Sequence, residues 1–340
     1  MSAESDLIRL HARINALGRR LGFDPVRCER IRLVAAEIAT NQTKYAQGKG
    51  CIQVWEVTGA QRALDLFALD WGVGIADLSG AMQDGHSSSG TLGKGLGAIS
   101  RLSDAFDIYS LPAERPVRPW SGTAVWARFG AVDDPLWQRV GLFTRPYQDG
   151  PCNGDLVALH RIGTHMRVLH LDALGHGCPA EAVATLALGA FDPLGDLKDV
   201  LQRIDRALSA GRGAALALFD LDFSEGVARS IGAGNLQASI LQGSGKQTIR
   251  ITPGVIGQVH GRLEPTESHW PYGALFMSAS DGLRASWDPA SAPGLLRRHP
   301  QLVAYFMGQT AGRISDDKSL LVVRNSAAGE RGGEHGTEKQ

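Results

Sequence analysis

The first part of the chain alternates between helical and strand periodicity. Apolar residues three and four apart form one stripe on the segment 6–23, which predicts an amphipathic helix ending at Gly22. The stripe consists of Leu7, Leu10, Ile14, Leu17 and Leu21. It indicates core packing, with a dimer or partner seam as the alternative. The pattern then predicts helices at 26–46 and 97–106 and strands at 51–57, 63–70, 107–111 and 122–129.

The composition changes between Gly130 and Gly154, where glycine, proline and aspartate are frequent. We interpret this stretch as a linker that merges into a strand. Apolar runs beyond it predict strands at 154–162, 164–174, 213–223, 227–241, 247–253, 274–280 and 319–325, and helices at 179–191 and 194–210. This pattern is typical of a sheet-rich core flanked by helices, so the fold class is α+β with two domains. The polar, glycine-rich segment 326–340 predicts a disordered tail.

Composition narrows the classes of protein that this chain can represent. Its 340 residues suffice for about two domains. The 35 basic and 35 acidic side chains cancel, which argues against a nucleic-acid or membrane-surface partner. No apolar run approaches the length of a membrane span. The four cysteines lack a Cys-x-x-Cys spacing, and we therefore expect a reduced, cytoplasmic protein.

A glycine-rich stretch, SSSGTLGKGLG at 87–97, raises the question of phosphate binding. It is no Walker A loop, because Lys94 is followed by Gly95, and a serine run stands where a dinucleotide fingerprint needs a strand. Glu37, Asn41 and Lys44 share one face of the second predicted helix. An ordinary solvated helix often carries such a trio, so these features alone leave the question open.

Four motifs in order change this picture: EIATNQTKYA (37–46), DWGVGIADL (70–78), DGHSSSGTLGKGLGAISRLSDAF (84–106) and SGTAV (121–125). With them, residues 5–130 resemble the histidine-kinase-like ATPase superfamily, specifically its branch of anti-sigma and RsbT-type serine kinases. The resemblance implies a Bergerat α/β sandwich over residues 1–130 that binds ATP and Mg²⁺. The segment 112–120 is longer than usual in this branch, either as a partner-contact loop or as a tolerated surface insertion.

The same resemblance assigns roles to individual residues. It implies that Asn41 holds Mg²⁺, that Asp70 accepts a hydrogen bond from the adenine amino group, and that Glu37 orients or deprotonates the attacking hydroxyl. Lys94 is a phosphate contact or simply a solvated lysine. The other ATP-binding residues that it implies are Lys44, Gly72, Gly74, Gly93, Gly95, Gly97 and Thr123.

A second group of acidic residues follows apolar strands in the later part of the chain. Its members are Asp155, Asp172, Asp281 and Asp316. Buried carboxylates at strand ends pair, become protonated or bind metal, although each aspartate taken singly could be a turn residue. Because no Cys and His spacing suggests zinc, an all-oxygen cluster favours Mg²⁺ or Mn²⁺.

These acids lie in GD, DALGHGCPAEA (172–182), AGN (233–235), SDGL and DDKSLLVV. Residues 137–325 thereby resemble the SpoIIE/RsbX branch of the metal-dependent PPM-type serine phosphatases, which implies an α-β-β-α sandwich after a linker at 131–136. The resemblance implies two Mn²⁺ or Mg²⁺ ions, with Asp155 and Asp172 bridging or flanking them, Ala173 adding its carbonyl, and Asp281 and Asp316 holding the second ion.

Other polar residues near the four aspartates are expected to support the site without binding metal. We expect His176 to shape its loop, Asp317 to be a poorer ligand than Asp316, and Ser280 and Ser319 to keep the hydroxyl of the family's threonines. His160, His165 and His170 recur along strands and are interpreted as structural histidines.

Together the two resemblances predict a bifunctional regulator of bacterial partner switching. The kinase domain would phosphorylate a serine or threonine of a STAS-domain protein, and the phosphatase domain would reverse it. A sigma factor or another regulator could lie downstream, and a homodimer is possible. The alternatives are an ATP-binding docking module with an inert second domain, or a phosphatase that ATP regulates.

Overall fold

The computed structural model describes residues 3–57, 62–82, 95–113, 120–130, 137–284, 288–313 and 315–326. The chain forms two compact units, one of Met1–Gln138 with Ser291–Leu302 and one of Arg139–Ala290 with Val303–Gln340. The segment Ser291–Leu302 thus belongs to unit 1 although it follows most of unit 2 in sequence. The domain boundaries predicted from the sequence stay predictions. The predicted linker 131–136 and all of the predicted tail except Ser326 lie outside the described residues.

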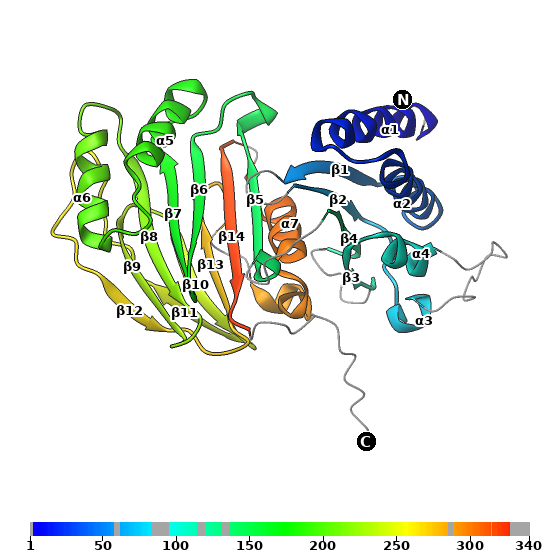
Figure 1. The fold of residues 1–340 in the computed structure, drawn as a ribbon. Helices are drawn as coiled ribbons and strands as arrows, with labels where there is room; N and C mark the ends of the chain where they lie inside the picture. The colour runs from blue at the N-terminus through cyan, green and yellow to red at the C-terminus, as the bar shows by residue number, and fades with distance from the viewer. Residues whose placement is uncertain are drawn as a thin grey trace, which may run out of the picture. The chain divides into compact units, whose positions relative to one another are not determined.

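Unit 1 is a two-layer sandwich of helices on an antiparallel sheet (Figure 1). Ile14 and Leu21 of the first helix are buried, and Leu10 and Leu17 pack against the same core, which confirms core packing for the predicted stripe. The strands run in the order β1-β2-β4-β3. The elements are α1 (Ala3–Leu21), α2 (Pro25–Tyr45), β1 (Gly50–Val57), β2 (Ala63–Asp70), α3 (Leu78–Met82), α4 (Gly95–Leu102), β3 (Ala105–Leu111) and β4 (Gly122–Phe129).

Helix α2 carries three of the predicted site residues and begins at a well-defined cap. The side chain of Asp24 accepts a hydrogen bond from the backbone N–H of Arg27 at 2.7 Å, and Pro25 occupies the first turn. Both features are typical helix starts, because the cap satisfies an otherwise unpaired donor and proline needs none there. The helix buries Ile31, Val34 and Ile38 against the sheet, which leaves the opposite face for polar residues.

Unit 2 contains two five-stranded antiparallel sheets. One has the order β12-β9-β8-β7-β6 and the other β11-β10-β13-β14-β5. The strands are β5 (Val140–Arg145), β6 (Asp155–Ile162), β7 (His165–Ala173), β8 (Ala214–Asp222), β9 (Val227–Ala233), β10 (Gln237–Gln242), β11 (Gly245–Ile249), β12 (Thr266–His269), β13 (Leu275–Ala279) and β14 (Lys318–Arg324). The helices are α5 (Cys178–Ala190), α6 (Leu197–Leu208) and α7 (Pro300–Thr310), which runs from unit 1 into unit 2.

The layers of unit 2 follow from which side chains each strand turns to which face. Leu169 and Leu171 of β7 pack in one apolar cluster with Val200 and Ile204 of α6, so α5 and α6 cover the β6–β9 sheet (Figure 1). On the other face of that sheet, Phe219 meets Phe276 of β13 with ring centroids 4.9 Å apart. The two sheets therefore pack face to face, as the predicted α-β-β-α sandwich requires.

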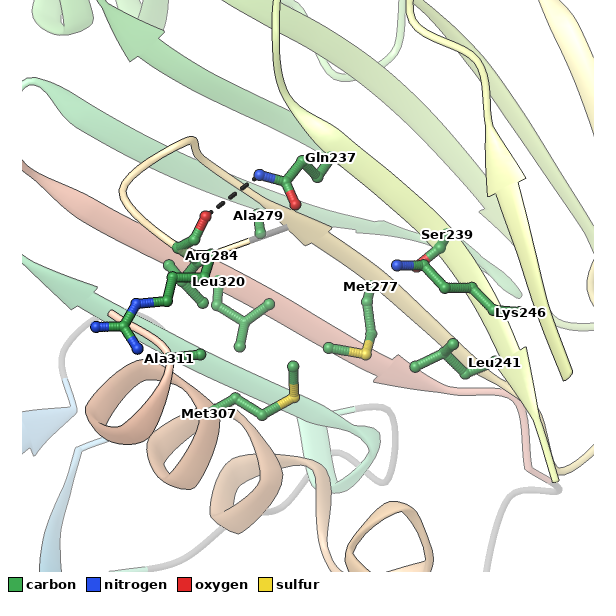
Figure 2. Close-up of a pocket in the computed structure, with 11 residues that line it drawn as sticks. Gln237, Ser239, Leu241, Lys246, Met277, Ala279, Arg284, Met307, Ala311 and Leu320 are labelled. Carbon is green, nitrogen blue, oxygen red and sulfur yellow. Dashed lines mark hydrogen bonds between the residues drawn. The ribbon is translucent and has the colours of Figure 1, made fainter. Parts of the chain in front are cut away.

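Helix α7 lies against the second sheet. Gly308 approaches the ring of Phe143 so closely that a Cβ at this position would clash. Figure 2 shows Met277 and Met307 pointing toward each other between that sheet and the helix, in a small pocket of about 50 Å³. Flexible methionines fill such irregular gaps well, so we interpret the pocket as a packing feature.

The structure differs from the predicted elements in several places. Helix α3 and strand β5 were not predicted, and the predicted helix 97–106 ends at Leu102, so that its last two residues belong to β3. The segment 227–241 is two strands, β9 and β10, which belong to different sheets. Gly234 between them has φ +132, a backbone conformation that favours glycine and lets the chain change sheets. Strand β12 and helix α7 were not predicted, because β12 is short and polar and α7 is apolar on most sides, which removes the helical periodicity.

The expectation of reduced cysteines is wrong for one pair. Cys152 and Cys178 form a disulfide, with Cα atoms 5.0 Å apart. Cys152 lies just before β6 and Cys178 begins α5 just after β7, so the β6–β7 hairpin brings them together across 26 residues of sequence. Their spacing in the sequence does not reveal this proximity. Within the described part of the chain, no helix is long and apolar enough to span a bilayer.

Breaking this disulfide is expected to destabilise unit 2. The double variant Cys152→Ser, Cys178→Ser should lose about 2 to 4 kcal/mol of unfolding free energy, because the bond restricts the unfolded chain. Urea unfolding of the oxidised protein and the variant measures this loss. Cys51→Ser, which removes a thiol that is not in the disulfide, serves as the control. Four alkylatable thiols in unfolded wild-type protein without reductant would contradict the prediction.

Candidate functional sites

The polar face of α2 meets the beginning of α4. A Cβ built on Gly95, the first residue of α4, would lie 2.7 Å from Oε1 of Glu37 and 3.6 Å from Nδ2 of Asn41. Glycine at this position leaves room for the Glu37 carboxylate beside the first turn of α4. Unpaired backbone N–H groups at the start of a helix attract anions, so the arrangement combines a carboxylate, an amide and an anion-binding helix end.

Asp70 at the end of β2 organises the neighbouring turn. Its Oδ1 accepts hydrogen bonds from the backbone N–H groups of Gly72 at 2.9 Å and Thr123 at 3.1 Å. Both bonds among the described residues go to Oδ1, which leaves Oδ2 to accept from a ligand. Burial raises the pKa of Asp70, and the two backbone bonds partly offset this.

The glycines around Asp70 are required by close packing. Gly74 has φ +71, and a Cβ there would clash with the carbonyl of Leu111. Ser110 joins the same turn: its hydroxyl accepts from the backbone N–H of Ile75 at 2.8 Å and lies 3.0 Å from the hydroxyl of Thr123. The turn after β2 is therefore held in place by contacts with β3 and β4.

The remaining predicted ATP-site residues are less well defined. Lys44 is exposed on the last turn of α2, and Gly97 is buried in α4. Gly93 and Lys94, with most of the serine and glycine stretch, lie outside the described residues.

The four aspartates of unit 2 come from the ends of strands that meet at one edge. Asp155 begins β6 and pairs in register with Asp172 near the end of β7. Asp281 follows β13 and Asp316 precedes β14, two strands that are paired with each other. A hydrogen bond from Ser319 of β14 to Oδ2 of Asp155, at 2.7 Å, joins the two sheets here.

Electrostatics indicate that these carboxylates are close enough to repel one another. Burial, with smaller contributions from Asp317 and Asp316, raises the pKa of Asp155 to about 7. Burial together with Asp155, Asp281 and Asp316 raises the pKa of Asp172 to about 8. Burial and then Asp281 also raise the pKa of Asp316. Mutual repulsion of this kind is typical of a cation site.

The donor set fits a hard divalent ion. Oδ1 of Asp155 is buried and has no hydrogen-bond partner, which is costly for a carboxylate unless a cation contacts it. Oxygen ligands suit Mg²⁺ or Mn²⁺. In the described part of the chain, no three His, Cys, Asp or Glu side chains already stand in a ligand arrangement, so the carboxylates would need to reorient on binding.

Residues beside the aspartates have structural partners. Asp317 accepts backbone hydrogen bonds from Tyr147 at 2.7 Å and Gly154 at 2.9 Å, so both of its oxygens hold the connection between β5 and β6. His176 is exposed and packs against the ring of Tyr147. His170 is fully buried, and burial lowers its pKa to about 3.

Comparisons with known proteins agree with this division. Residues 2–129 match the family described as histidine kinase-like ATPase domain, and residues 163–326 match stage II sporulation protein E (SpoIIE). The serine/threonine-protein kinase RsbT of Bacillus subtilis (strain 168) is 37% identical over 112 residues, which are 33% of this chain and 84% of RsbT. The chain belongs to the RsbT family in its first domain, and its second domain matches the SpoIIE family model.

Two solved structures were also found to be similar to part of the chain. One, from work on the bacterial stressosome as a modular system adapted to control secondary messenger signalling, is 28% identical with a TM-score of 0.50, covering 55% of this chain and 98% of that one. A structure of RsbX in complex with magnesium is 15% identical with a TM-score of 0.44, covering 53% and 92%.

Sequence reasoning missed several residues around the SpoIIE-domain acids. The side-chain amide of Asn235 donates to Oδ2 of Asp281 at 2.7 Å. The guanidinium of Arg212 lies beside Gly175, with Nη1 3.0 Å from the position of a Cβ there. The AGN motif was a signal for Asn235. Nothing in the local sequence of Arg212 indicates that the turn between α6 and β8 reaches the glycine-rich loop 175–177, which follows β7.

The raised pKa values predict how the stability of the SpoIIE domain depends on pH. Asp155 and Asp172 titrate at about 7 and about 8 in the fold, against 3.8 ordinarily, so the folded state binds more protons than the unfolded state in this window. The stability of the metal-free domain should therefore fall as the pH rises from about 5 to about 9. Mn²⁺ should restore it most strongly at the alkaline end.

Thermal unfolding in EDTA and in Mn²⁺ across this pH range measures the effect. Asp172→Asn should flatten the pH dependence in EDTA, since it removes one of the two titrating groups. A wild-type unfolding temperature in EDTA that stays constant or rises over this range would contradict the assignment.

Proposed function

We propose that the chain is a bifunctional regulator of partner switching. Its RsbT-type domain would phosphorylate a serine or threonine of a STAS-domain protein with ATP, and its SpoIIE domain would remove that phosphate. The match to RsbT, which is named as a serine/threonine-protein kinase, supports the first activity. The SpoIIE family match supports the second. We further propose that the protein acts in the cytoplasm and that a sigma factor or similar regulator lies downstream.

In the kinase domain, Asp70 would recognise the adenine. Its Oδ2 can accept from the adenine amino group while Oδ1 is held by two backbone donors. The start of α4 at Gly95 would face the phosphates. Asn41 would hold Mg²⁺, which neutralises phosphate charge, and Glu37 would orient the substrate hydroxyl and accept its proton. Lys44, Gly72, Gly74, Gly93, Lys94, Gly97 and Thr123 remain predicted ATP contacts.

In the phosphatase domain, the observation that carries the proposal is the unpartnered, buried Oδ1 of Asp155 beside other carboxylates. Asp155 and Asp172 would hold two Mn²⁺ or Mg²⁺ ions, with Asp281, Asp316 and the Ala173 carbonyl as further ligands. Such ions lower the pKa of water and neutralise the charge on phosphate oxygens. Asp317, with both oxygens bonded to backbone N–H groups, keeps the connection between β5 and β6 in place.

Arg212 would bind a phosphate oxygen of the substrate. Its guanidinium lies over the loop that follows Asp172, and a phosphate monoester needs a cation with directed donors. Arg212→Met should raise the KM for p-nitrophenyl phosphate by about 10- to 100-fold, while Mn²⁺ affinity stays unchanged. Arg206→Met on the exposed surface of α6 is the matched control. An unchanged KM would remove Arg212 from the site.

A phosphorylation cycle tests the proposed function as a whole. The protein is incubated with γ-labelled ATP, Mg²⁺ and a purified STAS-domain protein, then with excess unlabelled ATP and Mn²⁺. We expect label to enter the STAS protein and then appear as inorganic phosphate. Absence of transfer with several STAS proteins would overturn the kinase half, and persistence of label after Mn²⁺ would overturn the phosphatase half.

The rival function is an ATP-binding docking module with an inert second domain. The face of α2 argues against it, because docking alone needs neither Glu37 nor Asn41 beside the start of α4. Tight, ATP-dependent binding of a STAS protein without any phosphate turnover would favour the rival. A homodimer is a further possibility, although the stripe on α1 is already used in the core of unit 1.

A further inference from the structure

A buried histidine connects the two sheets of the phosphatase domain beneath the acidic edge. His170 lies on β7 two residues before Asp172, so both side chains face the other sheet. Its Nδ1 lies 2.7 Å from the hydroxyl of Ser278 on β13, and its Nε2 lies 2.8 Å from the hydroxyl of Ser319 on β14. All three residues are fully buried.

The chain of hydrogen bonds ends on a predicted metal ligand. The Ser319 hydroxyl also lies 2.7 Å from Oδ2 of Asp155. Ionised Asp155 only accepts, so the single proton of Ser319 points to it, and the Ser319 oxygen then accepts from Nε2–H of His170. Both ring partners are neutral hydroxyls, which favours a neutral imidazole at this depth. Nδ1 then accepts from the hydroxyl of Ser278. Each hydrogen bond from Ser278 to Asp155 therefore has a defined donor and acceptor.

The backbone holds this arrangement in place. The N–H of Ser319 donates to the hydroxyl of Ser280, and the N–H of Ser280 donates to the carbonyl of Ser319, each at 3.0 Å. Ser319 is thus fixed between Asp155 and His170. Oδ2 of Asp155 is bonded, whereas its Oδ1 has no partner.

We propose that His170 is a positioning residue for the metal site: through Ser319 it holds Oδ2 of Asp155 and leaves Oδ1 directed at a cation. The inference rests on the proposed function only in taking Asp155 as a ligand. A carboxylate held by an outer hydrogen bond loses less freedom on binding a metal, and loss of such partners commonly costs 10- to 100-fold in affinity.

Calorimetric titration of the full chain with Mn²⁺ tests the proposal. We expect His170→Leu and Ser319→Ala each to weaken Mn²⁺ binding about 10- to 100-fold. Ser319→Thr, which keeps the hydroxyl, and His170→Gln, which offers an N–H near the position of Nε2, should stay within about threefold of wild type. The double variant His170→Leu, Ser319→Ala should bind as weakly as Ser319→Ala alone, because both act through one bond.

A purely structural role would lower the unfolding temperature and leave Mn²⁺ affinity unchanged well below it. Folded His170→Leu protein with wild-type Mn²⁺ affinity therefore overturns the proposal. Nitrogen-15 NMR of histidine in metal-free wild-type protein at alkaline pH, where Asp155 is ionised, gives a second readout. The Nε2–H tautomer is expected for His170, and the Nδ1–H tautomer would contradict the hydrogen-bond chain.

The two hypotheses fail differently. If wild-type protein binds no Mn²⁺ or Mg²⁺, the proposed phosphatase function falls and the positioning role falls with it. If wild type binds Mn²⁺ and the His170 and Ser319 variants bind it equally well, only the positioning role falls.

Discussion

Asp172→Asn is expected to abolish Mn²⁺-dependent hydrolysis of p-nitrophenyl phosphate by the full chain. We expect less than about 1% of wild-type activity, since loss of a direct ligand should exceed the 10- to 100-fold cost of losing an outer partner. Asp172 pairs in register with Asp155 and is electrostatically coupled to three other aspartates, so its side chain lies at the centre of the acidic edge. This generic substrate needs no knowledge of the partner protein.

Protein stability separates loss of the site from loss of the fold. Ionised Asp172 is unfavourable in the metal-free fold, so Asp172→Asn should unfold at the same or a higher temperature than wild type at alkaline pH. Asp199→Asn makes the same chemical change on the exposed surface of α6 and should keep full activity. Wild-type hydrolysis by folded Asp172→Asn would contradict the metal assignment.

Glu37→Gln is expected to reduce phosphate transfer to a STAS-domain protein by about 10²- to 10⁴-fold, the usual contribution of a general base. The amide keeps the size of the carboxylate beside Gly95 and cannot accept the proton. ATP affinity should change little, because the turn around Asp70 is built by separate elements.

Transfer of label from γ-labelled ATP, measured beside equilibrium binding of a fluorescent ATP analogue, tests this prediction. Glu29→Gln, on the exposed side of the same helix, is the control. Transfer at the wild-type rate by Glu37→Gln would assign the base elsewhere. Transfer lost together with ATP binding would mean that Glu37 acts in binding instead.

Much of the fold could be predicted from local patterns. The helical spacing at 6–23, the predicted helix at 26–46 and the alternating strands of unit 1 all correspond to observed elements. Two of the elements that escaped prediction lack a local signal: α7 is apolar on most sides, and β12 has only four residues. The change of sheet at Gly234 depends on what the following strand pairs with, which the residues of 227–241 do not encode.

The same division applies to the candidate sites. Glu37 and Asn41 could be predicted to share a helix face from their spacing alone. Their position beside Gly95 required the packing of α2 against α4. Likewise the aspartates could be recognised at strand ends, whereas the link from Asp155 through Ser319 to His170 crosses between two sheets.

The sequence by itself determined the two families, the α+β fold class and the residue types of both sites, because motif spacing and periodicity depend on residues that are neighbours along the chain. Only the tertiary structure decided that Cys152 reaches Cys178, that Ser291–Leu302 belongs with unit 1, and that His170 is bonded instead of merely buried. These contacts join residues from 26 to more than a hundred positions apart. They form because strand pairing and sheet packing bury apolar surface throughout each unit. The residues that this process brings together therefore carry no sequence motif or periodicity that would reveal the contact.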